Sequence, residues 1–403
     1  MEKSYELSTN SYLCYLEKEP DAWITGRVTL DCPIDRGLLQ RAADDTLQAM
    51  PVLSARKAVA PEGDRYVLNA DGQPLRVRDH ARAEEPDGRE SGALVDISFE
   101  GSTLIVNVSH ALTDGCGFVA ILEHLVTRYL CRRWEELPEP AQALGQPSPY
   151  DYADPLEALP DPQERFDFEY PDAEFFEAGD LDPDGIQYFA LDCDERRIED
   201  LAREAEGSFS GVLAGVLGSA LKNCKPESGT LVITCPMDMR GILGCTRTLQ
   251  NCNQSMHYVF PPAIWKYPFQ QRLSMLKAQL YLQRSGEYCL PRFLEWRAQI
   301  RSLSAIPSVS GKAASLRALM RPSPYPIVSC LGEISFGKEM PHVKGLRLCY
   351  PVAGNAGLLL VAYRFGGRCR VDISSSVRGS MWLEQFRRVL TEAGVQNEQL
   401  MNT

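Results

Sequence analysis

The sequence lacks the features that mark several large classes of protein. None of its apolar runs approaches the ~20 residues that a membrane-spanning helix needs, so we expect no membrane span. The first residues, M-E-K-S-Y-E-L-S, do not form the apolar core of a secretory signal peptide. Basic residues are scarce, since 42 Lys and Arg stand against 54 Asp and Glu and give a net charge of −12. This balance argues against nucleic acid or an anionic membrane as the main partner, and we expect a cytoplasmic protein.

Several catalytic signatures are missing as well. None of the 13 cysteines lies in a Cys-x-x-Cys pair, which disfavours a zinc site, and a disulfide framework is not expected in a reducing compartment. The Gly-x-Ser-x-Gly elbow of serine hydrolases and the glycine-rich loops that bind nucleotide phosphates do not occur. Most cysteines are therefore interpreted as small buried hydrophobic residues. Cys116, at the expected start of a helix, is the one candidate for a reactive thiolate.

The most informative stretch covers residues 102–115 and reads S-T-L-I-V-N-V-S-H-A-L-T-D-G. Its alternating pattern, rich in β-branched residues, predicts a buried strand over the first half. Turn-forming residues that include Asp114 and Gly115 follow, and a strong apolar periodicity then predicts a helix over residues 115–134. The stretch therefore places His110 at the end of a buried strand, with Asp114 four positions later.

His110 has the chemistry of a general base. A neutral imidazole with a pKa near ~6.5 can accept a proton from a hydroxyl or an amine at neutral pH. Asp114 could orient this ring, cap the next helix or pair with an arginine. The spacing alone does not decide between this function and a structural one, in which Asp114 is simply an N-cap. A metal site formed by His110, Asp114 and His124 is disfavoured, because a turn and a helix segment separate the two imidazoles.

Length and composition suggest about two domains, at roughly 100–200 residues per domain. Strand and helix patterns alternate irregularly in both halves, which predicts an α/β fold made of two α+β sandwiches. Between residues 150 and 185, 13 Asp or Glu stand against one basic residue, with five prolines, as is typical of an exposed linker. We therefore expect an N-terminal subdomain over residues 1–150, an acidic crossover linker over 151–185, and a C-terminal subdomain over 186–403.

One region departs from the acidic balance. Residues 264–321 carry ten Lys or Arg against two Glu, in helical patterns. A solvated helical face is one interpretation, and a site for a phosphate-bearing cofactor is the other. Elsewhere the patterns predict strands at 23–30, 65–68, 75–77, 186–193, 231–235 and 327–336, a hairpin of 358–364 with 368–374, and helices at 35–50, 194–205, 208–221 and from 379.

Five stretches, taken in order, resemble the chloramphenicol acetyltransferase-like superfamily, which includes alcohol acetyltransferases, polyketide-associated acyltransferases and condensation domains. S-H-A-L-T-D-G-x-G resembles its H-x-x-x-D-G motif, and residues 33–56 are similar to its first helix and the turn after it. S-P-Y-D-Y-A-D (148–154), C-P-M-D-M-R (235–240) and V-S-C-L-G (328–332) resemble its Y-x-D-Y-A, D-x-R and S-N-L-G elements. The resemblance covers most of the chain, from about residue 3 to residue 395.

The resemblance implies two subdomains, each a mixed β-sheet flanked by helices, with a tunnel between them. It makes His110 the general base that deprotonates a hydroxyl or amine acceptor, which then attacks a thioester without an acyl-enzyme. Asp114 is implied to be structural and to pair with Arg240 from the other half. Gly115 lets the chain turn tightly and a substrate approach. The implied co-substrate is acyl-coenzyme A, with no bound cofactor and no metal.

The sequence departs from the family pattern at three places. Ser109 stands where condensation domains usually carry the first of two histidines, Cys330 stands where Asn is expected, and S-F-G-K-E (335–339) does not reproduce the D-F-G-W-G element of plant acyltransferases. We expect no fused carrier domain, so transfer from free acyl-coenzyme A, with an alcohol acceptor favoured, is the leading hypothesis. A condensation-like enzyme that uses a carrier-protein thioester is one alternative. A non-catalytic member that binds a ligand or a partner is the other.

Overall fold

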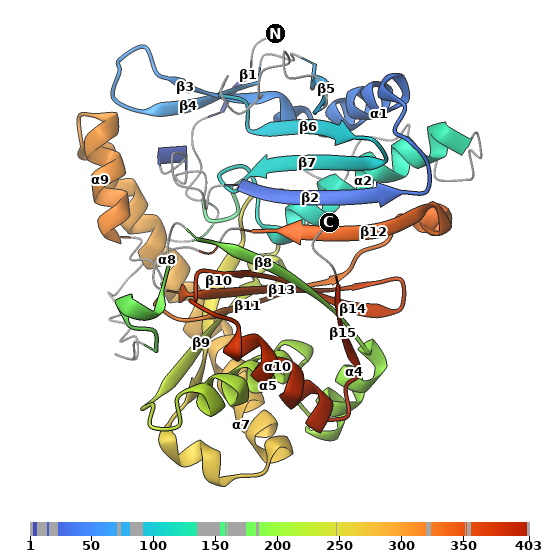
Figure 1. Cartoon of the computed structure of the whole chain (residues 1–403). Coiled ribbons are helices and arrows are strands. Elements are labelled where there is room, and N and C mark those ends of the chain that lie inside the picture. The colour runs from blue at the N-terminus through green and yellow to red at the C-terminus, as the bar shows by residue number, and fades with distance from the viewer. Residues whose placement is uncertain are drawn as a thin grey trace.

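The computed structural model describes residues 3–5, 14–15, 23–70, 74–80, 92–134, 154–157, 159, 175–182, 185–246, 248–319, 324–350, 352 and 356–400. Within them, the N-terminal half, blue to cyan, lies above most of the C-terminal half, green to red (Figure 1). Most of the expected acidic linker falls outside the described residues. So do residues 148–153 of the S-P-Y-D-Y-A-D stretch. The subdomain boundaries at residues 150 and 186 therefore stay predictions.

The upper half is built on a five-stranded mixed sheet, in which only β5 and β6 run parallel. A three-stranded antiparallel sheet lies beside it. The two short strands expected on either side of residues 69–72 belong to these two different sheets. In sheet order, the strands are β12 (Val343–Cys349), β2 (Trp23–Leu30), β7 (Thr103–Ser109), β6 (Val95–Glu100) and β5 (Val77–Asp79), then β1 (Lys3–Tyr5), β4 (Tyr66–Ala70) and β3 (Ala55–Val59).

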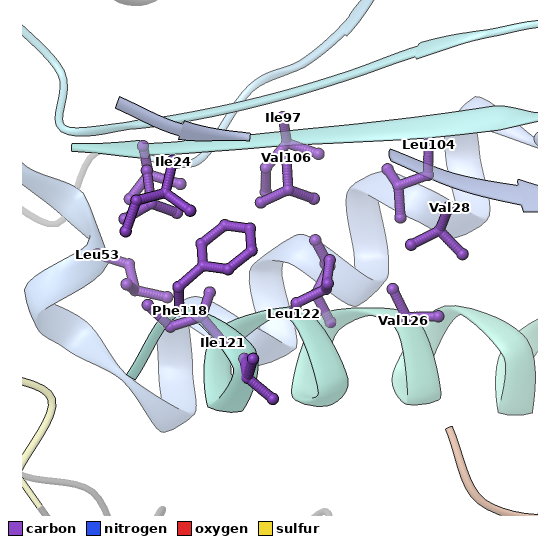
Figure 2. Close-up of a cluster of buried hydrophobic side chains, with 14 of the residues drawn as sticks. Ile24, Val28, Leu53, Ile97, Leu104, Val106, Phe118, Ile121, Leu122 and Val126 are labelled. Carbon is purple, nitrogen blue, oxygen red and sulfur yellow. The ribbon is translucent and has the colours of Figure 1, made fainter. Parts of the chain in front are cut away.

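Two helices, α1 (Arg36–Ala49) and α2 (Gly115–Trp134), cover the five-stranded sheet. The side chain of Asp35 caps α1 by accepting a hydrogen bond from the Leu38 amide at 2.8 Å, as expected for an N-cap. Apolar side chains of α2 point toward those of β2, β6 and β7 (Figure 2). Phe118 reaches the sheet because Gly26 has no side chain, since a Cβ there would lie 2.9 Å from its ring.

The lower half is built on a seven-stranded mixed sheet, with helices on its underside (Figure 1). Its strands, in sheet order, are β10 (Asn253–Phe260), β9 (Leu231–Asp238), β11 (Ile327–Glu333), β13 (Leu358–Phe365), β14 (Arg368–Ser375), β8 (Gln187–Cys193) and β15 (Asn397–Leu400). The α-helices are α4 (Glu195–Glu204), α5 (Phe209–Cys224), α6 (Arg240–Leu243), α7 (Phe269–Gln283), α8 (Gly286–Ser302), α9 (Val309–Leu319) and α10 (Met381–Glu392). Short 3-10 turns span Pro51–Ser54, Ala178–Asp180, Pro262–Lys266, Leu303–Ala305 and Gly337–His342.

Strand β13 is buried on both faces and joins the two halves. Leu359 and Val361 pack into the hydrophobic cluster that contains the upper sheet and α2. Leu358 and Leu360 point the other way, into the cluster formed with α5 and α10. Because side chains alternate along a strand, one continuous apolar run can serve two cores at once. The two halves therefore share a hydrophobic interface. This interface fixes the position of one half relative to the other.

Strand β12 makes a second connection, because it comes from the C-terminal part of the chain but pairs with β2 in the upper sheet. Its Arg347 donates through Nε to Asp372 of β14 at 2.5 Å, and the Tyr363 hydroxyl donates to the same carboxylate at 2.8 Å. Burial raises the pKa of Asp372 above its usual value. The network links the upper sheet to the lower one through a largely buried pair of Arg347 with Asp372.

The basic region forms α7, α8 and α9, and its buried cations bind backbone carbonyl groups. Arg297 donates to the carbonyls of Leu156 and Leu159, both at 2.6 Å, and is 1% exposed. Lys312 on α9 donates to the carbonyl of Asp64 at 2.7 Å, which ties this helix to the upper half. Arg297 and Lys312 are neither solvated nor open to a phosphate. For these two residues, the interpretations of the region as a solvated face and as a phosphate site are therefore both wrong.

Among the described helices, none combines the length and the hydropathy that crossing a membrane requires.

Candidate active site

The candidate site is built on the turn between β7 and α2. Strand β7 ends at Ser109, whose carbonyl accepts from the Leu112 amide at 2.9 Å and whose hydroxyl accepts from the Ala111 amide at 3.2 Å. These bonds turn the chain and leave His110 partly exposed at the strand end. Within the described part of the chain, the buried Nδ1 of His110 has no hydrogen-bond partner. A buried polar atom without a hydrogen-bond partner costs about 1–3 kcal/mol of stability. His110 is therefore a candidate for a hydrogen bond to a bound ligand.

Asp114 is fully buried, and both of its carboxylate oxygens accept hydrogen bonds. Oδ1 accepts from the Gly117 amide at 2.9 Å and from Nη2 of Arg240 at 3.0 Å. Oδ2 accepts from Nη1 of Arg240 at 2.9 Å and from the Cys252 amide at 2.8 Å. Asp114 thus caps α2 and pairs with an arginine, which are two of the three functions considered from the sequence. The structure brings Asp114 and Arg240 together as the resemblance implies.

Arg240 opens α6 at the end of β9, and all five N–H groups of its guanidinium donate hydrogen bonds. Two go to Asp114, one to Asp238 Oδ1 at 2.9 Å, one to the Thr248 carbonyl at 2.9 Å and one to the Gln250 carbonyl at 2.7 Å. Burial alone would lower the pKa of Arg240, but the charge and hydrogen bonds of Asp114 outweigh burial and raise it. Arg240 therefore stays charged in a site that water barely reaches.

Residues 248–252, which we call the strap, hold this pair against the first half of the chain. Besides the bonds to Arg240 and Asp114, the Leu249 carbonyl accepts from the Thr113 hydroxyl at 2.7 Å. The strap contributes mainly backbone carbonyl and amide groups, and such groups leave no side-chain motif in a sequence. The sequence interpretation therefore missed the strap, although it found both ends of the ion pair that the strap surrounds.

A steric reason for glycine at position 115 comes from the other half of the chain. Its backbone does not adopt a positive φ, so left-handed backbone is not what this position needs, and the expectation that Gly115 lets the chain turn tightly and a substrate approach stays a prediction. A Cβ at this position would instead lie 2.6 Å from Cδ2 of Leu331 and 3.4 Å from the hydroxyl of Tyr350. Leu331 belongs to the V-S-C-L-G stretch on β11. The H-x-x-x-D-G motif therefore needs glycine at position 115, because Leu331 of the V-S-C-L-G stretch packs against it.

Cys116 does not provide the thiolate that its place at a helix start suggests. Burial raises the pKa of its thiol to about 12, and the charges of Asp114 and Asp238 act in the same direction. These effects outweigh the helix dipole. The thiol is protonated at neutral pH, and the interpretation of Cys116 as a reactive thiolate is wrong.

His124 is engaged by its own helix. Its Nε2 accepts a hydrogen bond from Nε of Arg128, one turn further along α2, at 2.6 Å. In the described ranges, no group of three or more His, Cys, Asp or Glu side chains is placed to hold a metal ion. A shallow open hollow is lined by Gln187, Tyr188, Phe189, Gly379 and Ser380, and it includes none of the motif residues. The chemistry of the site therefore depends on His110 and on what surrounds it.

His124 is expected to make the protein less stable in weak acid. Burial, and then the charge of Arg128, lower the pKa of His124 from 6.5 to about 4. Between these two values the unfolded chain binds more protons than the folded one, so the free energy of unfolding falls as the pH falls from 6.5 toward 4. Replacement His124→Gln should weaken this dependence in urea unfolding at pH 7.5, 6 and 5. The same change at exposed His80 should leave it intact, and equal pH dependences of wild type and His124→Gln would contradict the assignment.

Comparison with solved structures identifies the fold. The two mixed sheets with their flanking helices form the fold of the chloramphenicol acetyltransferase-like superfamily, as the sequence resemblance predicted. No protein-family model and no curated protein sequence matches the chain.

Three solved structures illustrate this likeness. Polyketide synthase associated protein 5 from Mycobacterium tuberculosis has 16% identity, with 96% of each chain covered and a TM-score of 0.63. TRI101 of F. sporotrichioides, complexed with coenzyme A and T-2, has 14% identity over 96% of this chain and 97% of that chain, with a TM-score of 0.63. The first condensation domain of the calcium-dependent antibiotic synthetase, in complex with a substrate analogue, has 15% identity over 97% of each chain and a TM-score of 0.64.

Proposed function

We propose that the protein is an acyltransferase that moves an acyl group from a thioester to a hydroxyl or amine acceptor, with His110 as general base. The observation that carries the proposal is the position of His110. It follows a central strand, in a turn to which the other half of the chain is hydrogen-bonded. The ion pair of Asp114 with Arg240 and the strap together fix this turn. The fold adds support, because one similar structure, TRI101, is complexed with coenzyme A.

The chemistry of the proposed reaction needs one group that takes and returns a proton. His110 accepts the proton from the acceptor, and the acceptor oxygen or nitrogen attacks the thioester carbonyl. The C–S bond then breaks, and the imidazolium returns the proton to the leaving sulfur, which departs as a thiol. Such proton transfer contributes roughly 10²–10⁴-fold to a rate. No side chain becomes acylated in this scheme, so it requires no cysteine or serine nucleophile.

In this proposal acyl-coenzyme A is the donor and an alcohol is the acceptor, and both would reach His110 through the tunnel that the family resemblance implies between the two halves. Asp114, Arg240 and Gly115 take no proton in this scheme. They hold the turn, and Leu331 and Tyr350 pack against its end. Burial raises the pKa of Tyr350 well above its usual value, so its hydroxyl remains protonated.

A carrier-protein thioester is the second candidate for the donor. The likeness to a condensation domain favours it, at 15% identity and a TM-score of 0.64. Ser109 argues against it, because this residue is fully buried in the turn and replaces the first of the two histidines that condensation domains usually carry. A non-catalytic member of the fold, which only binds a ligand or a partner, would show no thioester turnover of either kind.

A panel of thioesters is expected to separate these candidates. The full chain, mixed with acyl-coenzyme A donors of increasing chain length and pooled alcohols or amines, should release free coenzyme A in an acceptor-dependent way. A thiol-reactive chromophore measures the release, and mass spectrometry identifies the acylated acceptor. Transfer from carrier-bound thioesters alone would select the second candidate. Absence of transfer from both kinds of thioester would refute the acyltransferase proposal.

A further inference from the structure

Two cysteines lie close together, Cys245 before the strap and Cys252 at its end. The sulfur atoms of Cys245 and Cys252 are 3.9 Å apart. Cys245 is partly exposed, and Cys252 is fully buried. Both main chains are anchored, since the Cys245 amide donates to the Arg240 carbonyl at 3.0 Å and the Cys252 amide donates to Asp114 at 2.8 Å. The closeness of the two sulfurs therefore follows from backbone contacts that the candidate site itself provides.

The two sulfurs are near enough to bond. A disulfide needs an S–S distance of about 2.05 Å, so the sulfurs must approach each other by roughly 1.9 Å. In the proposed disulfide the partly exposed side chain of Cys245 moves toward Cys252, which is fully buried. The anchored amide of Cys252 can then keep its bond to Asp114.

We propose that Cys245 and Cys252 form a reversible disulfide, which makes this pair an oxidation site of the protein. A peroxide is the oxidant. The Cys245 sulfur attacks one peroxide oxygen and becomes a sulfenic acid, and water leaves when the oxidant is hydrogen peroxide. The Cys252 sulfur then attacks the sulfenic sulfur, the S–O bond breaks and a second water leaves. In sum, two thiols and one hydrogen peroxide give one disulfide and two waters, and a dithiol reductant reverses the change.

The order of the two steps follows from exposure. Peroxide reacts first with Cys245, which is the more exposed residue of the two. Cys252 is fully buried, so it is not the first to react with peroxide and acts as the resolving cysteine. Cys252 needs no access to solvent in this role, because its target is the neighbouring sulfur.

The disulfide would close a loop that contains most of the strap. The carbonyl groups of Thr248 and Gln250, which bind Arg240, and that of Leu249, which binds Thr113, all lie between the two cysteines. Cross-linking the ends of such a loop restricts the unfolded chain more than the folded one. The oxidised protein should therefore melt at a temperature higher by roughly 2–5 °C. The inference does not depend on the proposed acyl transfer.

Peptide mapping tests the pair directly. Arg247 lies between the two cysteines, so trypsin separates them into the peptides 241–247 and 248–266. The reduced full chain is treated with hydrogen peroxide at a few equivalents, remaining thiols are blocked with N-ethylmaleimide, and the digest is analysed by mass spectrometry. The two peptides should appear linked, with a mass two hydrogens below their sum, and should separate after reduction. Melting curves before and after oxidation, with and without dithiothreitol, measure the shift in stability.

Two variants make the test decisive. Cys245→Ser should abolish both the linked peptide and the rise in melting temperature, and its melting in the reduced state shows that it is folded. Cys224→Ser, which removes another partly exposed thiol, should leave both signals intact. Recovery of Cys245 as a sulfinic acid with Cys252 blocked by maleimide would overturn the proposal. Linkage of either cysteine to a different peptide would overturn it as well.

Discussion

Replacement of His110 by alanine is expected to lower the rate constant of acyl transfer by about 10²–10⁴-fold, with little change in KM. The physical reason is the loss of the group that takes the proton from the acceptor. Stability should change little, because His110 is partly exposed. Among the described residues its buried Nδ1 has no hydrogen-bond partner, so the substitution leaves no group unpaired there. The measurement is kcat and KM with the best thioester of the panel, together with thermal melting of both proteins.

The control for this variant is His80→Ala, because His80 is exposed and lies on the turn after β5. It should keep wild-type kcat. Full activity of His110→Ala would remove His110 from the mechanism, although the fold would stand. A large fall in melting temperature together with lost activity would instead show that His110 serves to hold the turn, which is the structural interpretation that spacing alone left open.

The elements around the site could be predicted because their sequence patterns are local. The period-two alternation of residues 103–109 gives β7, the apolar period of residues 115–134 gives α2, and Asp35 marks the start of α1. The hairpin of β13 and β14 also follows the predicted turn, with Phe365 opposite Arg368. In each case the residues that form the contact are close together in the chain.

Elements that depend on distant partners could not be predicted in this way. Strand β12 was not found, since V-K-G-L-R-L-C mixes charges and glycine with apolar residues. Its burial comes from pairing with β2 and from the bond of Arg347 to Asp372, and both partners are far away in the sequence. The strap was missed for a related reason, because its backbone groups bind Arg240 and Thr113 regardless of side chain. Family resemblance supplied the pairing of Asp114 with Arg240, which spacing alone could not.

Replacement of Asp114 by alanine is expected to lower the free energy of unfolding by about 3–5 kcal/mol. The charge of Arg240 would remain buried without its counter-ion. The amides of Gly117 and Cys252 would also lose their acceptor, and each buried donor without a partner adds to the cost. Urea unfolding measures the change. Asp114→Asn, which keeps the shape and one acceptor oxygen, should be destabilised less than Asp114→Ala.

A double variant separates the charge from the other contacts of Asp114. Asp114→Ala combined with Arg240→Met removes the unpaired charge, so it should regain part of the lost stability. Recovery should stay incomplete, because the Gly117 and Cys252 amides are still without an acceptor. Asp200→Ala is the control, since it breaks an exposed pair with Arg203 and should cost only about 0–1 kcal/mol. Unchanged stability of Asp114→Ala with lost activity would contradict the structural assignment and place Asp114 in the proton transfer itself.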